Sequence, residues 1–105
     1  MASMNDLVNL YKLEQAIQIN KIQGNYQQLL ILYDKIIEMK SKLSNKLGLA
    51  KTISEKGFLL EQLGYHREAL EQFNFAKHIA RGTPNKDFIC IIENRIEKIE
   101  NSQLL

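Results

Sequence analysis

Apolar residues recur along this chain at intervals of three and four positions, and mostly polar residues fill the positions between them. That spacing places the apolar side chains on one face of an α-helix. We predict five helices, over residues 5–23, 26–43, 46–63, 66–80 and 84–101. The pattern therefore predicts a single all-α domain that spans residues 1–105.

Each predicted helix carries an apolar stripe that we expect to form the core. The stripes comprise Leu10, Leu13 and Ile17; Leu29, Leu32, Tyr33, Ile36 and Leu43; Ala50, Ile53, Gly57 and Leu60; Ala69, Phe73, Ala76 and Ala80; and Phe88, Ile92, Ile96 and Ile99. Gly57 and Ala69 are small where leucine would be the usual choice, which predicts a close approach of two helices. Gln72 is expected to be exposed.

The breaks between the helices contain residues that favour turns. Gly64 follows the third predicted helix and suits the left-handed conformation at a helix end. In the last break we predict that Thr83 caps the fifth helix and that Pro84 lies in its first turn. Cys90 is the only cysteine, and because its neighbours are apolar we expect it to be a small buried residue.

One segment of the chain is repeated after about forty residues. In the first copy, Gly24 precedes an apolar pair by five and six positions and the aromatic Tyr33 by nine. In the second copy, Gly64 precedes an apolar pair and Phe73 by the same intervals. A repeated helix-turn-helix of this length is typical of helical solenoids, which usually bind other proteins.

The second copy resembles the tetratricopeptide repeat family. Positions that match the family are Gly57, Leu60, Gly64, Ala69, Leu70, Phe73 and Ala76, and in the first copy Gly24, Tyr26, Leu30 and Tyr33. The resemblance implies a right-handed α-α solenoid of two helix pairs, about 5–43 and 46–82, with a capping helix at about 84–101. The first two predicted helices also resemble a microtubule-interacting-and-trafficking domain, although the second copy and the five helices favour the repeat.

Residues with catalytic or metal-binding chemistry do not form a recognisable motif. His66 and His78 lack a third ligand at metal-binding spacing, and Cys90 has no obvious histidine partner. Glu93, Glu97 and Glu100 are interleaved with basic residues and are expected to form a solvated face. We therefore expect no enzyme activity, no cofactor and no metal site.

Charge and hydropathy narrow the choice of partner. The 14 basic and 12 acidic residues are well mixed, which disfavours binding to nucleic acid. No apolar run is long enough for a membrane span, so we expect no membrane partner. A single cysteine fits a reducing compartment, and we predict a cytoplasmic protein.

The resemblance implies that the first helix of each pair lines a concave groove that holds a partner. The candidate partner-binding residues are Tyr11, Glu14, Gln18 and Lys21 from the first copy, and Lys51, Ser54, Glu55, Phe58 and Gln62 from the second. Glu14 and Gln18 stand where the family's clamp for C-terminal carboxylates has lysine and asparagine, which disfavours that ligand. Phe58 is either an exposed anchor in the groove or a core residue beneath the fifth helix.

These observations leave two functional hypotheses. The first is a non-enzymatic interaction module or scaffold that binds a peptide or helix of a partner protein. The second is a structural subunit that forms a homodimer through the last helix, where Ile89 and Ile91 lie outside the apolar stripe.

Overall fold

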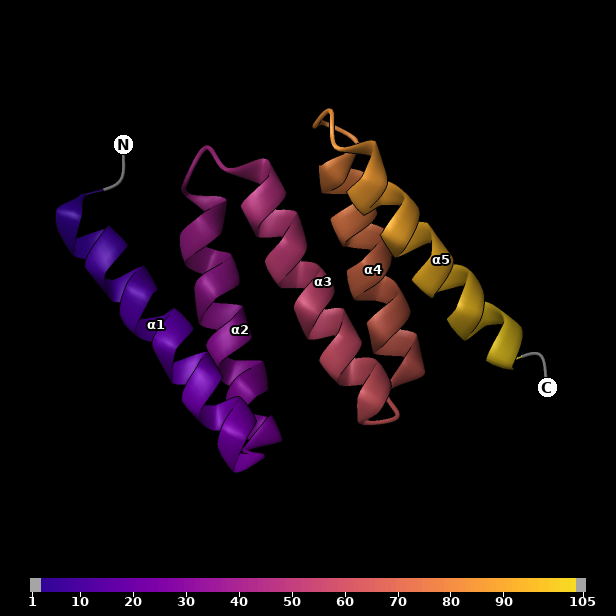
Figure 1. Ribbon diagram of the computed structural model, residues 1–105, viewed down its shortest axis with the longest axis horizontal. Helices are drawn as coiled ribbons and strands as arrows, with labels where there is room; N and C mark the ends of the chain where they lie inside the picture. Colours follow the sequence, from indigo (N-terminus) through magenta and orange to yellow (C-terminus); the bar gives the residue numbers. More distant parts are fainter. Residues whose placement is uncertain (1–2, 104–105) are drawn as a thin grey trace. The chain divides into compact units, whose positions relative to one another are not determined.

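Five helices make up most of the protein. The computed structural model describes residues 3–103, of which about 85% are helical and none lies in a strand. The helices are α1 (Met4–Gln23), α2 (Tyr26–Ser41), α3 (Lys46–Gln62), α4 (His66–Ala80) and α5 (Lys86–Gln103) (Figure 1). The prediction of an all-α chain is confirmed. The helices divide into two compact units, Met1–Asn45 and Lys46–Leu105.

The first unit is a hairpin of α1 and α2 (Figure 1). Ser3 and Asp6 begin α1 with a capping box, in which the Ser3 hydroxyl accepts from the Asp6 N–H at 3.1 Å and the Ser3 N–H donates to the Asp6 carboxylate at 3.2 Å. Gly24 ends α1 in the left-handed conformation, with φ of 70°. Ile17 is buried in α1, and the buried stripe of α2 consists of Leu29, Leu32, Tyr33 and Ile36.

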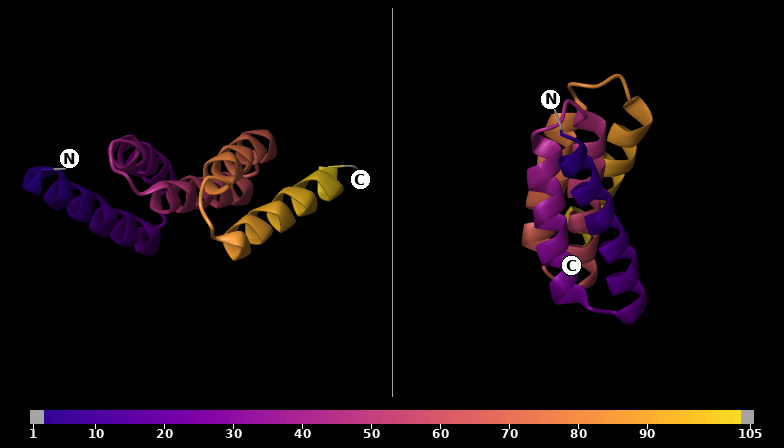
Figure 2. Two further views of the ribbon diagram at one scale, coloured as in Figure 1. Left: turned by 90° about the horizontal axis from the view of Figure 1, so that it is seen from above. Right: turned by 90° about the vertical axis from the view of Figure 1, so that its left-hand side faces the viewer.

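The second unit consists of α3, α4 and α5. Figure 2 shows α4 packed against α3 and α5, which lie on the same side of it. The predicted stripes of α3 and α4 are buried at every position, as are Ile92, Ile96 and Ile99 of α5. Gly64 adopts φ of 88° in the turn between α3 and α4, as its place in the sequence predicts.

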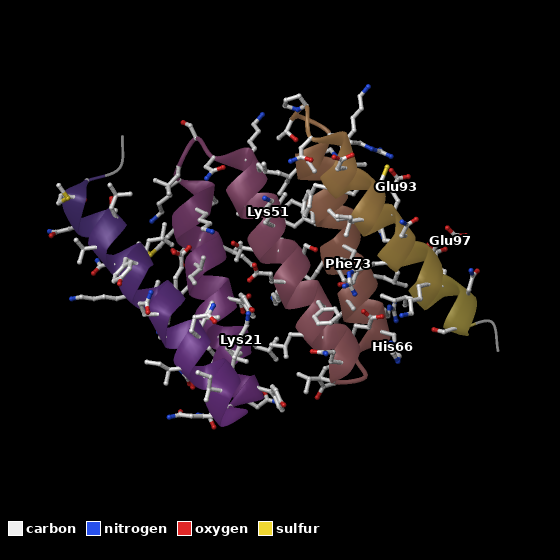
Figure 3. All side chains as sticks on the ribbon, viewed as in Figure 1. Lys21, Lys51, His66, Phe73, Glu93 and Glu97 are labelled. Atoms are coloured by element: carbon white, nitrogen blue, oxygen red, sulfur yellow. The ribbon has the colours of Figure 1, made fainter. Side chains whose placement is uncertain are left out.

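The close approach of α3 to α4 is confirmed at Gly57. A Cβ atom on this residue would lie 3.2 Å from Cε1 of Phe73 and 3.3 Å from Cβ of Gln72. Phe73 is completely buried against α3 (Figure 3), and Ala69 is completely buried one turn before it. The prediction of an exposed Gln72 is wrong, because this residue lies beside the glycine and is half-buried.

The ends of α2 and α5 differ from the prediction by two residues, and those of α1 and α3 by one. α2 ends at Ser41, two residues early, and α5 begins at Lys86 instead of Pro84. Asn85 caps α5, since its side-chain oxygen accepts from the Phe88 N–H at 3.1 Å. The Thr83 hydroxyl instead donates to the Ala80 carbonyl at 2.7 Å, so that it satisfies the end of α4.

The prediction that Cys90 is buried is also wrong. Its thiol is free and the residue is exposed. Cys90 lies two residues before Ile92, which corresponds to about 200° around a helix and places it away from the buried stripe. An apolar run in a helix therefore does not bury all its members, because only one face meets the neighbouring helix.

Candidate functional site

Three side chains from α3 and α5 meet on the surface of the second unit. The guanidinium carbon of Arg95 lies 4.3 Å from the centre of the Phe58 ring. Nη1 of the same guanidinium lies 3.8 Å from Oε1 of Glu61. We call Phe58, Glu61 and Arg95 the arginine cluster.

Helix periodicity explains why these residues meet. Phe58 and Glu61 are three residues apart, and side chains at that spacing share one face of a helix. Arg95 lies three residues after the buried Ile92 and directly before the buried Ile96, at the edge of the α5 stripe. A long side chain at such an edge can lie along apolar surface and keep its charged head near water.

The arginine cluster is partly buried and partly open to solvent. Phe58 is 39% exposed, so that Arg95 covers the ring without enclosing it. Oε1 of Glu61 is buried and accepts no hydrogen bond from the described residues. Its nearest positive charge is Arg95, whose side chain is itself partly exposed. The guanidinium therefore compensates a buried carboxylate on one side and has further N–H donors available to a ligand.

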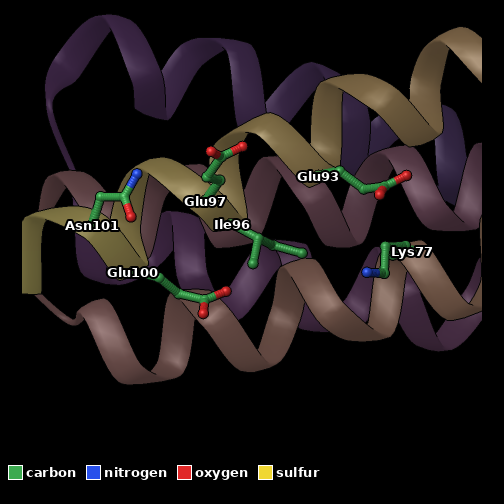
Figure 4. Close-up of a pocket in the computed structure, with 6 residues that line it drawn as sticks. All are labelled: Lys77, Glu93, Ile96, Glu97, Glu100 and Asn101. Carbon is green, nitrogen blue, oxygen red and sulfur yellow. The ribbon is translucent and has the colours of Figure 1, made fainter.

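The two flanks of α5 differ in charge. Ile91 and Lys98 lie four residues before and three residues after Arg95, on the flank nearest α3, and both are exposed. The opposite flank carries the exposed carboxylates of Glu93, Glu97 and Glu100. Together with α4 they line a shallow pocket (Figure 4), whose lining residues are Lys77, Glu93, Ile96, Glu97, Glu100 and Asn101.

The candidate residues on α3 surround the arginine cluster only in part. Lys51, Glu55 and Gln62 are exposed, and Ser54 is half-buried. Among these candidates, Phe58 contacts another helix, because its ring lies beneath Arg95 of α5.

The candidate residues on α1 belong to the first unit. Tyr11, Gln18 and Lys21 are exposed. Glu14 forms an ion pair with Lys40 of α2, with Nζ and Oε1 3.3 Å apart, and thus contributes to packing within the hairpin.

Sequence reasoning missed the roles of Glu61 and Arg95. Arg95 is one of the basic residues interleaved with Glu93 and Glu97, for which the sequence predicts a solvated face, although its position beside Ile96 marks it as an edge residue of the stripe. That position was the signal available. No sequence pattern indicated which residue of α3 it would contact, since that depends on how α5 packs.

The two isoleucines proposed for self-association do not form one surface. Ile91 is 55% exposed, whereas Ile89 is half-buried. Two residues correspond to about 200° around a helix, so the side chains lie on opposite flanks of the buried stripe.

Among residues 3–103, no three His, Cys, Asp or Glu side chains gather closely enough to hold a metal ion. His66 and His78 are both exposed. Within the same range, no helix combines the length and the hydropathy that crossing a bilayer would require. In comparisons with known proteins, no protein-family model, no curated protein and no solved structure matches this chain.

Proposed function

We propose that this protein is a non-enzymatic interaction module of the tetratricopeptide type, with two helix pairs in a right-handed solenoid and α5 as the capping helix. It binds a peptide or helix of a partner protein along α3 and α5. The tight α3–α4 pair, with Gly57 against Phe73 and a left-handed Gly64 at the turn, supports the choice of family.

The observation that carries this proposal is the contact of Arg95 with Phe58. A partly exposed aromatic ring offers a large apolar area whose few rotatable bonds cost little entropy on binding. Aromatic and arginine side chains are also the residues that most often dominate binding energy at protein interfaces. Arg95 orients the ring, and the ring in turn limits the positions of the guanidinium.

The chemistry of this surface defines the partner. Phe58 and Ile91 provide apolar contacts, while Arg95 and Lys98 provide positive charge on the same flank of α5. A guanidinium with free N–H donors binds carboxylates well, because its planar fork matches their two oxygens. The partner segment therefore combines an aromatic or aliphatic side chain with aspartate or glutamate residues close to it.

Peptide display against the folded protein tests this proposal. Selected peptides should carry an apolar residue flanked by acidic residues. Titration calorimetry should show that Phe58→Ala and Arg95→Glu each weaken their binding at least tenfold, or about 1.4 kcal/mol. Chemical shift changes on titration should map to α3 and α5.

Lys86→Glu is the matched control for Arg95→Glu. It makes the same change of charge on the same helix, but nine residues correspond to about 180°, so that Lys86 lies on the opposite flank. This variant should retain most of the affinity. A selection that enriches no peptide, or peptides that bind both charge variants equally, would refute the proposed function.

Self-association through α5 is the second candidate, and the exposed Ile91 favours it. The contact would use only the Ile91 flank. In that case Ile91→Lys should shift a dimer to monomer in sedimentation experiments, and Ile89→Lys should mainly lower stability. A dimer that Ile91→Lys leaves intact would exclude this candidate.

A further inference from the structure

The flank of α5 nearest α3 changes in charge along its length. Asp87, Ile91, Arg95 and Lys98 follow one another at intervals of four, four and three residues, so their side chains share this flank. Arg95 is half-buried and the other three residues are exposed. We call these four residues the α5 ridge. From the N-terminal end of the helix, the ridge is negative, then apolar, then positive at two successive positions.

The spacing of the α5 ridge fits a helical partner. Along the helix axis, Ile91 lies about 6 Å from Arg95 and about 10.5 Å from Lys98, at about 1.5 Å per residue. In a second helix alongside, residues four and seven apart share a face and reproduce both distances. An extended segment advances about 3.3 Å per residue and alternates its faces, so its residue nearest the longer distance points away. Only the helix meets the whole ridge with one face.

The order of charges along the α5 ridge defines the direction of that helix. A complementary partner carries acidic residues opposite Arg95 and Lys98 and a basic residue opposite Asp87. If the partner runs antiparallel to α5, its acidic residues lie in its first turns and its basic residue lies near its end. The helix macrodipole stabilises charges placed in this way, whereas in the parallel direction both kinds of charge would oppose it.

The surroundings of the α5 ridge support an acidic, amphipathic partner on this flank. The Phe58 ring lies against Arg95 and adds an aromatic surface to the apolar contact that Ile91 provides. Glu61 faces one side of the Arg95 guanidinium, so the exposed Lys98 supplies much of the positive charge at this end. The carboxylates on the opposite flank of α5 would repel an acidic partner, which favours the ridge over that flank.

We propose that the partner segment is an amphipathic α-helix that lies antiparallel to α5 and complements the α5 ridge. Counted from its N-terminal end, it carries two acidic residues three positions apart, an aliphatic or aromatic residue four positions later, and a basic residue four positions after that. This inference rests on the proposed function, which places the partner along α3 and α5 and leaves its conformation and direction open.

Synthetic peptides test the conformation of the partner. The forward peptide has fourteen residues, with glutamate at the second and fifth positions, leucine at the ninth, lysine at the thirteenth, and alanine or glutamine elsewhere. The reversed peptide has the same residues in the opposite order. In titration calorimetry with the full chain, the forward peptide should bind at least threefold more tightly, because its charges stabilise its helix. A central proline in the forward peptide should weaken binding at least tenfold.

A nitroxide label on the forward peptide tests its direction. A label at the first residue should broaden the amide signals around Lys98 more than those around Asp87, and a label at the last residue should do the reverse. Lys98→Glu should weaken the forward peptide at least threefold, and replacing the peptide's first glutamate by lysine should recover most of that loss. Lys86→Glu, on the opposite flank, is the control and should change the affinity little.

The outcomes separate this inference from the proposed function. Equal affinities for the forward and reversed peptides, or broadening at the opposite end of α5, would overturn the antiparallel direction. A proline-containing peptide that binds as tightly would overturn the helical conformation. If peptides selected by display bind and the forward peptide does not, the inference fails and the proposed function stands. If no peptide from either source binds, the proposed function itself fails.

Discussion

Gly57 of α3 provides the space that the Phe73 ring of α4 occupies. A Cβ atom at this glycine would lie 3.2 Å from Cε1 of the ring, which is tighter than ordinary van der Waals contact. Phe73 has no exposed surface and cannot move toward solvent without repacking the core. The small residue and the large one are therefore complementary, and the distance between the two helices depends on both.

Gly57→Ala tests this complementarity. At an ordinary position inside a helix, the exchange of glycine for alanine stabilises a protein by about 1 kcal/mol. Overpacking costs about 1–3 kcal/mol, so we expect a net loss of stability of about 1 kcal/mol in urea denaturation. In a Phe73→Leu background the loss should shrink, because the smaller side chain leaves room for the methyl group. A Gly57→Ala protein more stable than the wild type would show that the two helices can separate freely.

Substitutions at Gly64 measure how much stability the left-handed backbone conformation costs when no steric clash contributes. Its φ is 88°, and an added Cβ would meet no atom within 4 Å. Gly64→Ala should lower stability by about 1–2 kcal/mol, the penalty for an L-residue in the left-handed region. Gly64→Asn should lose less, since asparagine tolerates that region. Equal losses for alanine and asparagine would indicate that the cost has another origin.

Phe58→Ala distinguishes a surface anchor from a core residue. Replacing a fully buried phenylalanine by alanine typically lowers stability by about 3–5 kcal/mol. Because Phe58 is 39% exposed, we expect a smaller loss of about 1–2 kcal/mol in urea denaturation. Phe75 of α4 is more exposed and serves as a control, whose alanine variant should lose less. A loss near 4 kcal/mol at Phe58 would assign its main role to the core.

Arg95→Met removes the charge and retains a long apolar side chain. The buried Oε1 of Glu61 would then lack its nearest cation, and an uncompensated polar group of this kind costs about 1–3 kcal/mol. Glu61→Gln should recover about 1 kcal/mol of this loss, because it removes the buried charge. Urea denaturation of the two single variants and the double variant measures this coupling. Additive losses would mean that Glu61 and Arg95 do not interact.

Local patterns in the sequence predicted the helices and their buried faces. The three- and four-residue spacing located all five helices, and every stripe position of α3 and α4 is buried. The sequence also predicted the close helix approach at Gly57 and the left-handed turn at Gly64, because a small residue on a stripe and a glycine after a helix each have a local physical cause. Such features depend on residues close in the chain, so the sequence alone determines them.

The arginine cluster was decided only by tertiary structure. Arg95 and Phe58 are far apart in the sequence, and their contact requires α5 to pack against α4 in one particular position. The same packing decides that Cys90 is exposed within an apolar run. The cap of α5 at Asn85 likewise depends on the loop, where Thr83 already donates to the end of α4. Helix periodicity indicates which face is apolar, but the position of the neighbouring helix determines which residues at the edge of that face contact its side chains.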